Sequence, residues 1–471
     1  MTAVINNEVE ALGAENANEV LRAVWPWVCR QRWCPTLPAT SEAGGSRDEV
    51  RVLAAWWLGT KMAEPPATRA LLLVVAMGPA GPILQVPLLA GERSQRGQSG
   101  EDSATIGTTE LWNLRDGSVE PVFWKGWAKA ATVLKGTREE LLRAATRVRP
   151  LGMEQSNTSV ILAGGPTLLI AKVFRVLHPG SHPEVELPEA LTRSQFAGVP
   201  TMYATWYLPQ LDSHSAGSYC SAVVSEMLSG ATDGFDLFVK FASEGADPSG
   251  EAYRLGILTA EMHDGLAKQL GLSVSLSPTT LTSRVEEALE AVTQEGYGGL
   301  VVGSDLAGDL ARILDDASEH QGAPLATQRI HGDLHLGQTL RTPDGSWYVL
   351  DFEGEPLKDI ATRSVPDVAV RDVAGMLRSF DYAWRRAQVD PDIEGWTRRA
   401  QQAFLEGYGS YRELLDTDVA ALEILQIEKA LYEVQYEAQF RPDYLPVPLD
   451  ALKALAESHD KKAKMRDLNH D

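Results

Sequence analysis

The chain has little cysteine and no long apolar run. Its three cysteines are too few for a disulfide framework and fit a reducing compartment. No stretch reaches the ~18 consecutive apolar residues of a membrane helix, and the first residues lack the basic region and apolar core of a signal peptide. We therefore expect a cytoplasmic protein that contacts no membrane.

Basic residues are also scarce, because 43 Lys and Arg face 64 Asp and Glu and give a formal net charge of −21. A phosphate backbone requires a basic protein face, so nucleic acid is excluded as a partner. The length of 471 residues, with 44% hydrophobic residues, predicts a well-packed chain of two or three domains.

Three segments follow from the patterning along the chain. Strand-like runs at 50–58, 69–76 and 82–89 precede a polar, Gly/Ser-rich stretch at 91–103, where we place the first boundary. Helical patterns dominate from about residue 206. The expected domains are residues 1–95, 96–205 and 206–471.

The most informative motif is His331-Gly-Asp-Leu-His-Leu-Gly-Gln338, followed by Asp351-Phe-Glu353. A turn signal at 342–345 and an apolar run at 347–350 predict a hairpin between the two clusters. Asp333 can take a proton from a hydroxyl, while Gln338, Asp351 and Glu353 offer the oxygen ligands that Mg²⁺ prefers. Each cluster alone is typical of an ordinary turn, but together they indicate phosphoryl transfer to an alcohol.

Lys172 lies inside an apolar strand of a second expected hairpin, at 159–162 and 167–174. A lysine there is either an edge-strand charge or a group that holds the phosphates of ATP. Glu184 and Glu186 are the candidates for orienting it, and we favour Glu186 because it begins a helix. Simple capping of that helix is the alternative.

Further candidates for ATP contacts flank these strands. A polar segment before the hairpin could cover the phosphates, although an ordinary turn explains it as well. An apolar strand that ends at 226–228 could give backbone groups to adenine. These candidates are Gln155, Ser156, Asn157, Glu226 and Leu228.

Several long segments resemble the maltokinases and maltokinase-like sugar kinases of Actinobacteria, which are similar to aminoglycoside phosphotransferases and eukaryotic protein kinases. The resemblance covers roughly residues 130–450 and implies an α+β, bilobal protein-kinase-like fold. That fold has an N-terminal cap subdomain on the small lobe and a mostly helical C-terminal lobe. The segments that carry the resemblance are 151–159, 172–179, 331–338, 351–356, 371–383 and 429–438.

The resemblance also implies cofactors and roles. ATP and Mg²⁺ would be the cofactors, and Asp333 would be the catalytic base. Gln338 and Asp351 would hold the metal, with a contribution from Glu353, while Lys172 and Glu186 would fix the phosphates. His331 would support the loop rather than react.

Two regions supply candidates for the acceptor site. Arg371 and Asp372 begin an amphipathic helix and could bracket a sugar or lock the catalytic loop through an ion pair. A helix at 422–439 repeats Glu and Tyr at spacings of three and four, which suits sugar hydroxyls and stacking, although a solvated acidic face is the alternative. Its candidate residues are Gln426, Glu428, Lys429, Tyr432, Glu433 and Tyr436.

The segments after Trp33 and around 91–105 depart from typical maltokinases, and the acidic residues near Gln426 would suit a protonated amine. We therefore expect an ATP-dependent sugar kinase whose acceptor leans to glucosamine or another hexose. The alternatives are a maltokinase, an aminoglycoside phosphotransferase and a non-catalytic scaffold. We expect a monomer or a homodimer.

Overall fold

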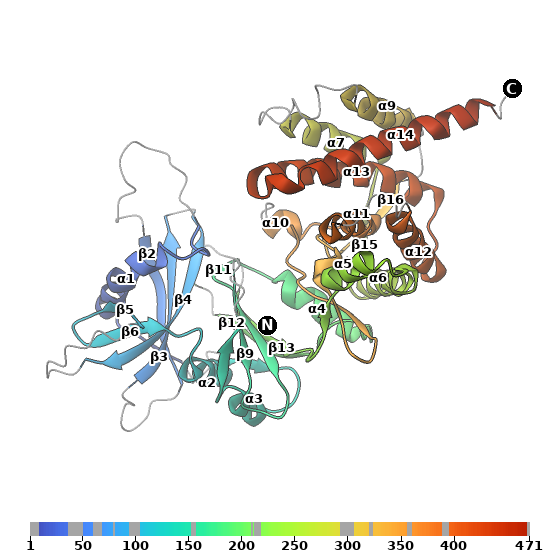
Figure 1. Cartoon of the computed structure of the whole chain (residues 1–471). Helices are drawn as coiled ribbons and strands as arrows, with labels where there is room; N and C mark the ends of the chain where they lie inside the picture. The colour runs from blue at the N-terminus through green and yellow to red at the C-terminus, as the bar shows by residue number, and fades with distance from the viewer. Residues whose placement is uncertain are drawn as a thin grey trace. The chain divides into compact units, whose positions relative to one another are not determined.

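The structure is a computed structural model of the chain (Figure 1). It divides the chain into two compact units, Met1–Glu186 with Pro200–Ser229 and Leu187–Val199 with Gly230–Asp471. The structure describes residues 9–35, 50–59, 68–78, 81–93, 104–151, 157–208, 211, 218–292, 306–319, 324–355, 360–388 and 395–468.

The first unit begins with an antiparallel sheet in the order β1-β2-β3-β4-β6-β5, onto whose β4 strand the short β11 also pairs. The runs expected as strands at 50–58, 69–76 and 82–89 form its centre. Helix α1 (Ala14–Val28) packs its apolar face on this sheet. The strands are β1 (Val9–Ala11), β2 (Val50–Leu58), β3 (Thr68–Met77), β4 (Ile83–Glu92), β5 (Thr105–Thr108), β6 (Trp112–Asp116) and β11 (Val176–Leu177).

The second sheet of this unit has the order β7-β12-β13-β10-β9-β8 and is also antiparallel. Strands β9 and β10 form the hairpin expected at 159–162 and 167–174. The helices are α2 (Pro121–Ala130), α3 (Arg138–Ala144) and the first turn of α4 (Pro183–Arg193). The strands are β7 (Thr132–Val133), β8 (Val148–Pro150), β9 (Thr158–Leu162), β10 (Leu169–Val173), β12 (Met202–Leu208) and β13 (Tyr219–Glu226).

A buried amide joins the two sheets. Gln85 of β4 is fully buried, and its side-chain nitrogen donates hydrogen bonds to the carbonyl of Phe174 at 2.6 Å and to that of Ser221. In return, the Ser221 hydroxyl donates to Gln85 Oε1 at 2.9 Å. Because buried polar groups need such partners, the N-terminal sheet and the second sheet share one polar core.

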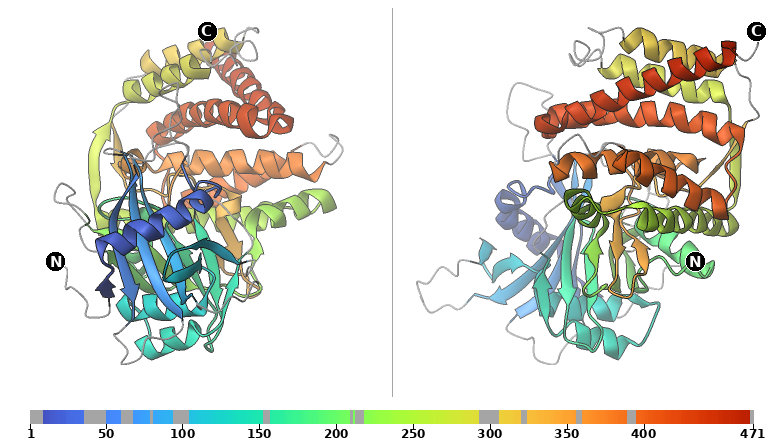
Figure 2. Two further views of the ribbon diagram at one scale, coloured as in Figure 1. Left: turned by 90° about the vertical axis from the view of Figure 1, so that its left-hand side faces the viewer. Right: turned by 45° about the vertical axis from the view of Figure 1, so that its right-hand side comes forward.

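The second unit is mostly helical and has one large apolar core. Helix α13 lies between α11 and α7 in this unit (Figures 1 and 2). Its helices are α5 (Gly234–Glu244), α6 (Ser249–Leu270), α7 (Pro278–Val292), α9 (Leu306–Glu319), α10 (Ile360–Arg363), α11 (Val370–Ala387), α12 (Trp396–Tyr411), α13 (Asp416–Phe440) and α14 (Pro446–Leu468), with 3-10 turns η3 (Leu336–Gln338) and η4 (Pro442–Tyr444).

Two small sheets complete this unit. One has the order β14-β17-β18 and contains the hairpin expected between the two catalytic clusters, while the other has the order β15-β16-β19. The turn of the hairpin closes with a hydrogen bond from the Gly345 amide to the Thr342 carbonyl at 2.9 Å. The strands are β14 (Thr232–Asp233), β15 (Leu272–Leu276), β16 (Leu325–Gln328), β17 (Thr339–Arg341), β18 (Trp347–Val349) and β19 (Asp367–Val368).

Candidate active site

The β17–β18 hairpin brings two of the predicted metal ligands together. Gln338 ends the 3-10 turn before β17, and Asp351 follows β18. The side-chain nitrogen of Gln338 donates to Asp351 Oδ2 at 3.3 Å, and the Leu350 amide donates to the Gln338 carbonyl at 2.9 Å. Asp351 has φ of 59°, a left-handed conformation that aspartate tolerates better than most residues. This bend turns its carboxylate towards the amide of Gln338.

The loop that carries Asp333 is anchored by Asp372 of α11. Asp372 accepts hydrogen bonds from the backbone amides of His331 at 2.8 Å and Gly332 at 2.9 Å. Its carboxylate is 1% exposed and also accepts from His263 Nε2 at 3.0 Å. Burial would raise the pKa of Asp372, but these hydrogen bonds, led by the one from His263, hold it below its ordinary value.

His331 links the loop to the end of the hairpin. Its Nε2 atom lies 2.8 Å from the Leu350 carbonyl, and its Nδ1 atom accepts from the Asp333 amide at 3.3 Å. The ring also packs against Phe352, with centroids 4.8 Å apart. These contacts suit a residue that holds the loop in place.

His263 extends the anchor into the core. It lies in α6, is fully buried, and its Nδ1 atom is 3.0 Å from the hydroxyl of Tyr408 in α12. Burial lowers the pKa of His263, so its ring is neutral at pH 7. A neutral ring that donates from Nε2 to Asp372 can accept from Tyr408 at Nδ1. The chain of hydrogen bonds from Tyr408 to the loop is therefore complete.

Asp333 itself is bound by a lysine. Lys429 Nζ, from α13, lies 3.1 Å from Asp333 Oδ1 and 2.8 Å from Glu355 Oε1. Burial would lower the pKa of Lys429, but the charges of Glu355 and Asp333 raise it above its ordinary value. Lys429 is therefore a permanent cation beside the predicted base.

Several residues predicted for the acceptor site are engaged in ion pairs within the protein. Arg371 pairs with Asp367 at 2.6 Å and with Glu428 at 2.8 Å. Glu433 is 8% exposed and accepts from Arg378 at 2.7 Å. The contacts of Arg371 fit the expectation of an ion pair within the protein.

Two of the acids expected near the sugar, Asp372 and Glu433, have their contacts inside the protein. Both carboxylates are buried, and both already accept strong hydrogen bonds from other parts of the protein. These contacts fit the expectation that Asp372 locks the catalytic loop, and the bonds from Arg378 join Glu433 of α13 to α11.

The remaining acceptor candidates lie on α13. Gln426 donates to the carbonyl of Leu422 in its own helix at 3.4 Å. Tyr432 and Tyr436 are half-buried and stacked, with ring centroids 6.4 Å apart at an angle of 19°, and Lys429 Nζ lies 4.9 Å from the Tyr432 ring centroid. The tyrosines form the aromatic surface that the sequence predicted for this helix.

In the first unit, Lys172 is in β10 between Ser159 of β9 and Val223 of β13. Its Nζ atom lies 3.6 Å from Glu184 Oε1, and the two side chains are 19% and 15% exposed. Glu184 is thus at ion-pair distance from Lys172, although the sequence analysis favoured Glu186. In kinases, a pair of a strand lysine and a helix carboxylate orients the lysine that binds phosphate.

The other described candidates for nucleotide contacts lie near strand ends. Glu226 ends β13, and its amide donates to the Thr201 carbonyl at 2.8 Å. Leu228 follows it and, like Asn157, is half-buried. Gln155 and Ser156 lie outside the described residues.

Gln338 and Asp351 are the donors that a magnesium ion would meet beside the hairpin. Within the described residues, no group of three or more His, Cys, Asp or Glu side chains converges as a metal site. Gln338 and Asp351 do supply an amide and a carboxylate in contact, and rotation of the amide exposes its oxygen. Mg²⁺ in phosphotransferases takes one or two protein ligands plus substrate phosphates and water, so this pair fits it.

Sequence reasoning missed Glu355, His263 and Tyr408. Glu355 stands in the segment Asp351-Phe-Glu-Gly-Glu355, so its proximity to the motif was a usable signal. His263 and Tyr408 come from helices far away in sequence, and only the packed fold brings them to Asp372.

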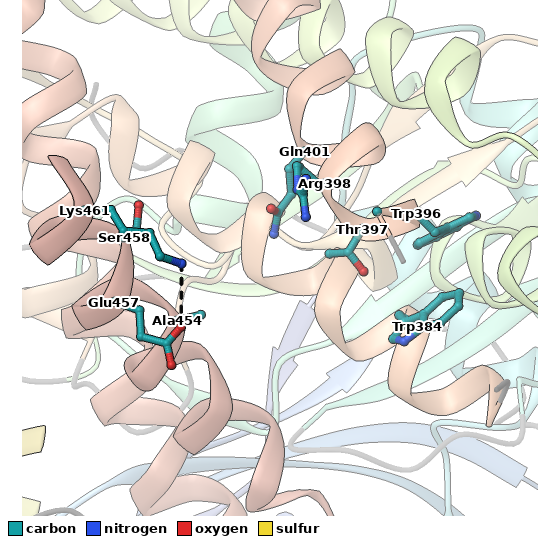
Figure 3. Close-up of a pocket in the computed structure, with 10 residues that line it drawn as sticks. Trp384, Trp396, Thr397, Arg398, Gln401, Ala454, Glu457, Ser458 and Lys461 are labelled. Atoms are coloured by element: carbon teal, nitrogen blue, oxygen red, sulfur yellow. Dashed lines mark ion pairs between the residues drawn. The ribbon is translucent and has the colours of Figure 1, made fainter. Parts of the chain in front are cut away.

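A surface hollow of about 780 Å³ lies elsewhere in the helical unit (Figure 3). Trp384 and Trp396 stack there with centroids 5.8 Å apart, beside Arg398 and Lys461. None of the predicted site residues lines it.

No helix among the described ranges is long and apolar enough to cross a membrane.

Two known proteins are similar to about two thirds of this chain. Glucosamine kinase of Mycolicibacterium smegmatis is 28% identical over 333 residues, which cover 65% of this chain and 79% of the relative. Glucosamine kinase of Streptacidiphilus jiangxiensis is 29% identical over 330 residues, which cover 64% and 72%.

Solved structures show the same fold. A glucosamine kinase in complex with glucosamine, ADP and inorganic phosphate matches with a TM-score of 0.62 and 24% identity, covering 89% of this chain and 96% of that one. Glucosamine kinase in crystal form A matches with a TM-score of 0.63 and 23% identity, covering 91% of this chain and 97% of that one. The expected protein-kinase-like α+β fold with a helical C-terminal part is thus confirmed. A model of the phosphotransferase enzyme family matches residues 147–414, more than half of the chain, and the chain belongs to that family.

Proposed function

We propose that this protein is an ATP-dependent kinase that transfers the γ-phosphoryl group of ATP to a hydroxyl of glucosamine. The observation that carries the proposal is the anchored loop. Asp372 fixes the backbone on the N-terminal side of Asp333, and Lys429 fixes its carboxylate. A base held in this way can orient an acceptor hydroxyl and take its proton.

The chemistry divides between named side chains. Asp333 orients the attacking oxygen and receives the proton as the new O–P bond forms and the bond to the leaving β-phosphate oxygen breaks. Lys172, oriented by Glu184, binds phosphate oxygens of the nucleotide. Gln338 and Asp351, with Glu353 nearby in sequence, would hold Mg²⁺, which neutralises charge on the phosphates when it is bound.

Glucosamine is proposed as the acceptor for two reasons. The two relatives described above are glucosamine kinases, and this supports glucosamine over the maltose and aminoglycoside alternatives. The half-buried, stacked tyrosines of α13 offer an aromatic face on which a sugar ring can pack.

The test is a coupled ADP-release assay with Mg·ATP across glucosamine, glucose, N-acetylglucosamine, maltose and kanamycin. We expect the highest kcat/KM with glucosamine and a large loss with N-acetylglucosamine, because acetylation removes the positive charge. Equal rates with glucose and glucosamine would reject recognition of the amine. Turnover with none of the acceptors, together with intact ADP binding, would favour a non-catalytic protein.

A further inference from the structure

From α13, Lys429 reaches both the catalytic loop and the segment after the hairpin. Its ammonium group contacts Asp333 at 3.1 Å and Glu355 at 2.8 Å. Glu355 is 4% exposed, and the side chains of Lys429 and Asp333 are each 16% exposed. One cation is therefore shared by two largely buried carboxylates.

The contact on Asp333 is selective. Lys429 bonds to Oδ1, which leaves Oδ2 to meet an acceptor hydroxyl. A carboxylate attached at one oxygen cannot rotate freely, so the direction of its other oxygen is set. Orientation of this kind is worth a large factor in rate, because a displacement of about 1 Å can cost about 100-fold.

We propose that Lys429 is a positioning residue for Asp333 and that Glu355 keeps its charge balanced during turnover. The inference rests on the proposed function. When Asp333 takes the acceptor proton, it becomes neutral and loses its attraction for Lys429. The ammonium stays paired with the Glu355 carboxylate, so no unpaired buried charge develops in that step.

This arrangement differs from a sugar-binding role for Lys429. A ligand of the sugar would change the KM for the acceptor when it is removed. A positioning residue changes kcat and leaves both KM values nearly unaltered, because it acts on the base in the bound complex. A merely structural link between α13 and the loop would lower stability and would not respond to added amines.

The experiment compares Lys429→Ala, Lys429→Arg and Glu355→Gln with Lys453→Ala, an exposed lysine of α14 as matched control. We expect Lys429→Ala to lose about 100-fold in kcat with KM values within about threefold of wild type. Added ethylammonium should raise the kcat of Lys429→Ala at least tenfold. Lys429→Arg should keep more activity than Lys429→Ala, Glu355→Gln should lose about tenfold, and Lys453→Ala should be unchanged.

The outcomes separate this inference from the proposed function. A wild-type enzyme inactive on every acceptor would reject the proposed function. An active wild type with Lys429→Ala near normal, with a loss confined to the acceptor KM, or without amine rescue would overturn the inference alone. If Lys429→Ala does not fold, Glu355→Gln decides the question, because full activity in that variant would contradict the shared-cation arrangement.

Discussion

Lys172 in the sheet unit and Lys429 in the helical unit both face carboxylates, but they are held differently. The Lys172–Glu184 distance is 3.6 Å, longer than a good hydrogen bond, whereas Lys429 makes contacts of 2.8 and 3.1 Å to two carboxylates. The longer Lys172–Glu184 contact can orient an ammonium group that also meets a ligand. The shorter contacts of Lys429 use its ammonium group to fix two carboxylates of the protein. Similar residues thus have different expected tasks, and the predictions below test that contrast.

The largest effect is expected at the carboxylate that Lys429 holds. Asp333→Asn should lower kcat about 1,000-fold or more, because the amide cannot accept the hydroxyl proton. ADP binding, measured by calorimetry, should remain. Asp344→Asn, on the exposed turn of the neighbouring hairpin, is the matched control and should be fully active. Substantial activity in Asp333→Asn would remove the basis for the whole helical-unit site.

The tight contacts of the helical unit should also appear in its stability. His263→Ala leaves Asp372 and Tyr408 without a buried partner and should cost about 3 kcal/mol of unfolding free energy. Differential scanning calorimetry measures this as a lower Tm. A Tm unchanged from wild type would show that the anchor of the loop does not depend on His263.

The pH dependence of stability follows from the same histidine. Burial lowers the pKa of His263 and of His335 in the folded state below the ordinary 6.5. As the pH falls below 6.5, the unfolded chain binds protons that the folded chain does not, so stability decreases. His263→Gln keeps a donor for Asp372 without titrating, and its stability should fall less steeply between pH 6.5 and 5. An identical slope would contradict the contribution of His263.

The lysine of the sheet unit, Lys172, should affect the nucleotide instead. Lys172→Met should weaken ADP binding about tenfold or more and lower kcat, with little change in the acceptor KM. Lys240→Met, whose lysine is 65% exposed on α5, serves as the control. If Lys172→Met left ADP affinity intact, the contrast between the two lysines would fail on the nucleotide side.

The smallest effect should distinguish the two acids near Lys172. Glu184→Gln should weaken ADP binding by about 1 kcal/mol, because an ion pair that is mostly buried is lost. Glu186→Gln, two residues away in the same helix, is the natural control and should have a smaller effect. The reverse order would restore the preference drawn from the sequence.

The sequence alone predicted what depends on neighbouring residues. Both hairpins, the place of Asp333 in a loop and Lys172 inside a strand follow from local patterns of apolar and turn residues. The choice between Glu184 and Glu186 did not, because residues two apart point to different faces of a helix. The contact of Asp372 with the catalytic loop was one of two expectations, whereas the partner of Glu433, 55 residues away, could not be foreseen.

The amide of Gln85 has a practical meaning for the N-terminal sheet. This side chain satisfies carbonyl groups of Phe174 and Ser221, which flank the strands that present Lys172. A shortened protein lacking residues 1–95 would lose these hydrogen bonds and expose the apolar core that the two sheets share. The N-terminal region is therefore an integral part of the sheet unit, and gene fragments that begin after it should yield insoluble protein.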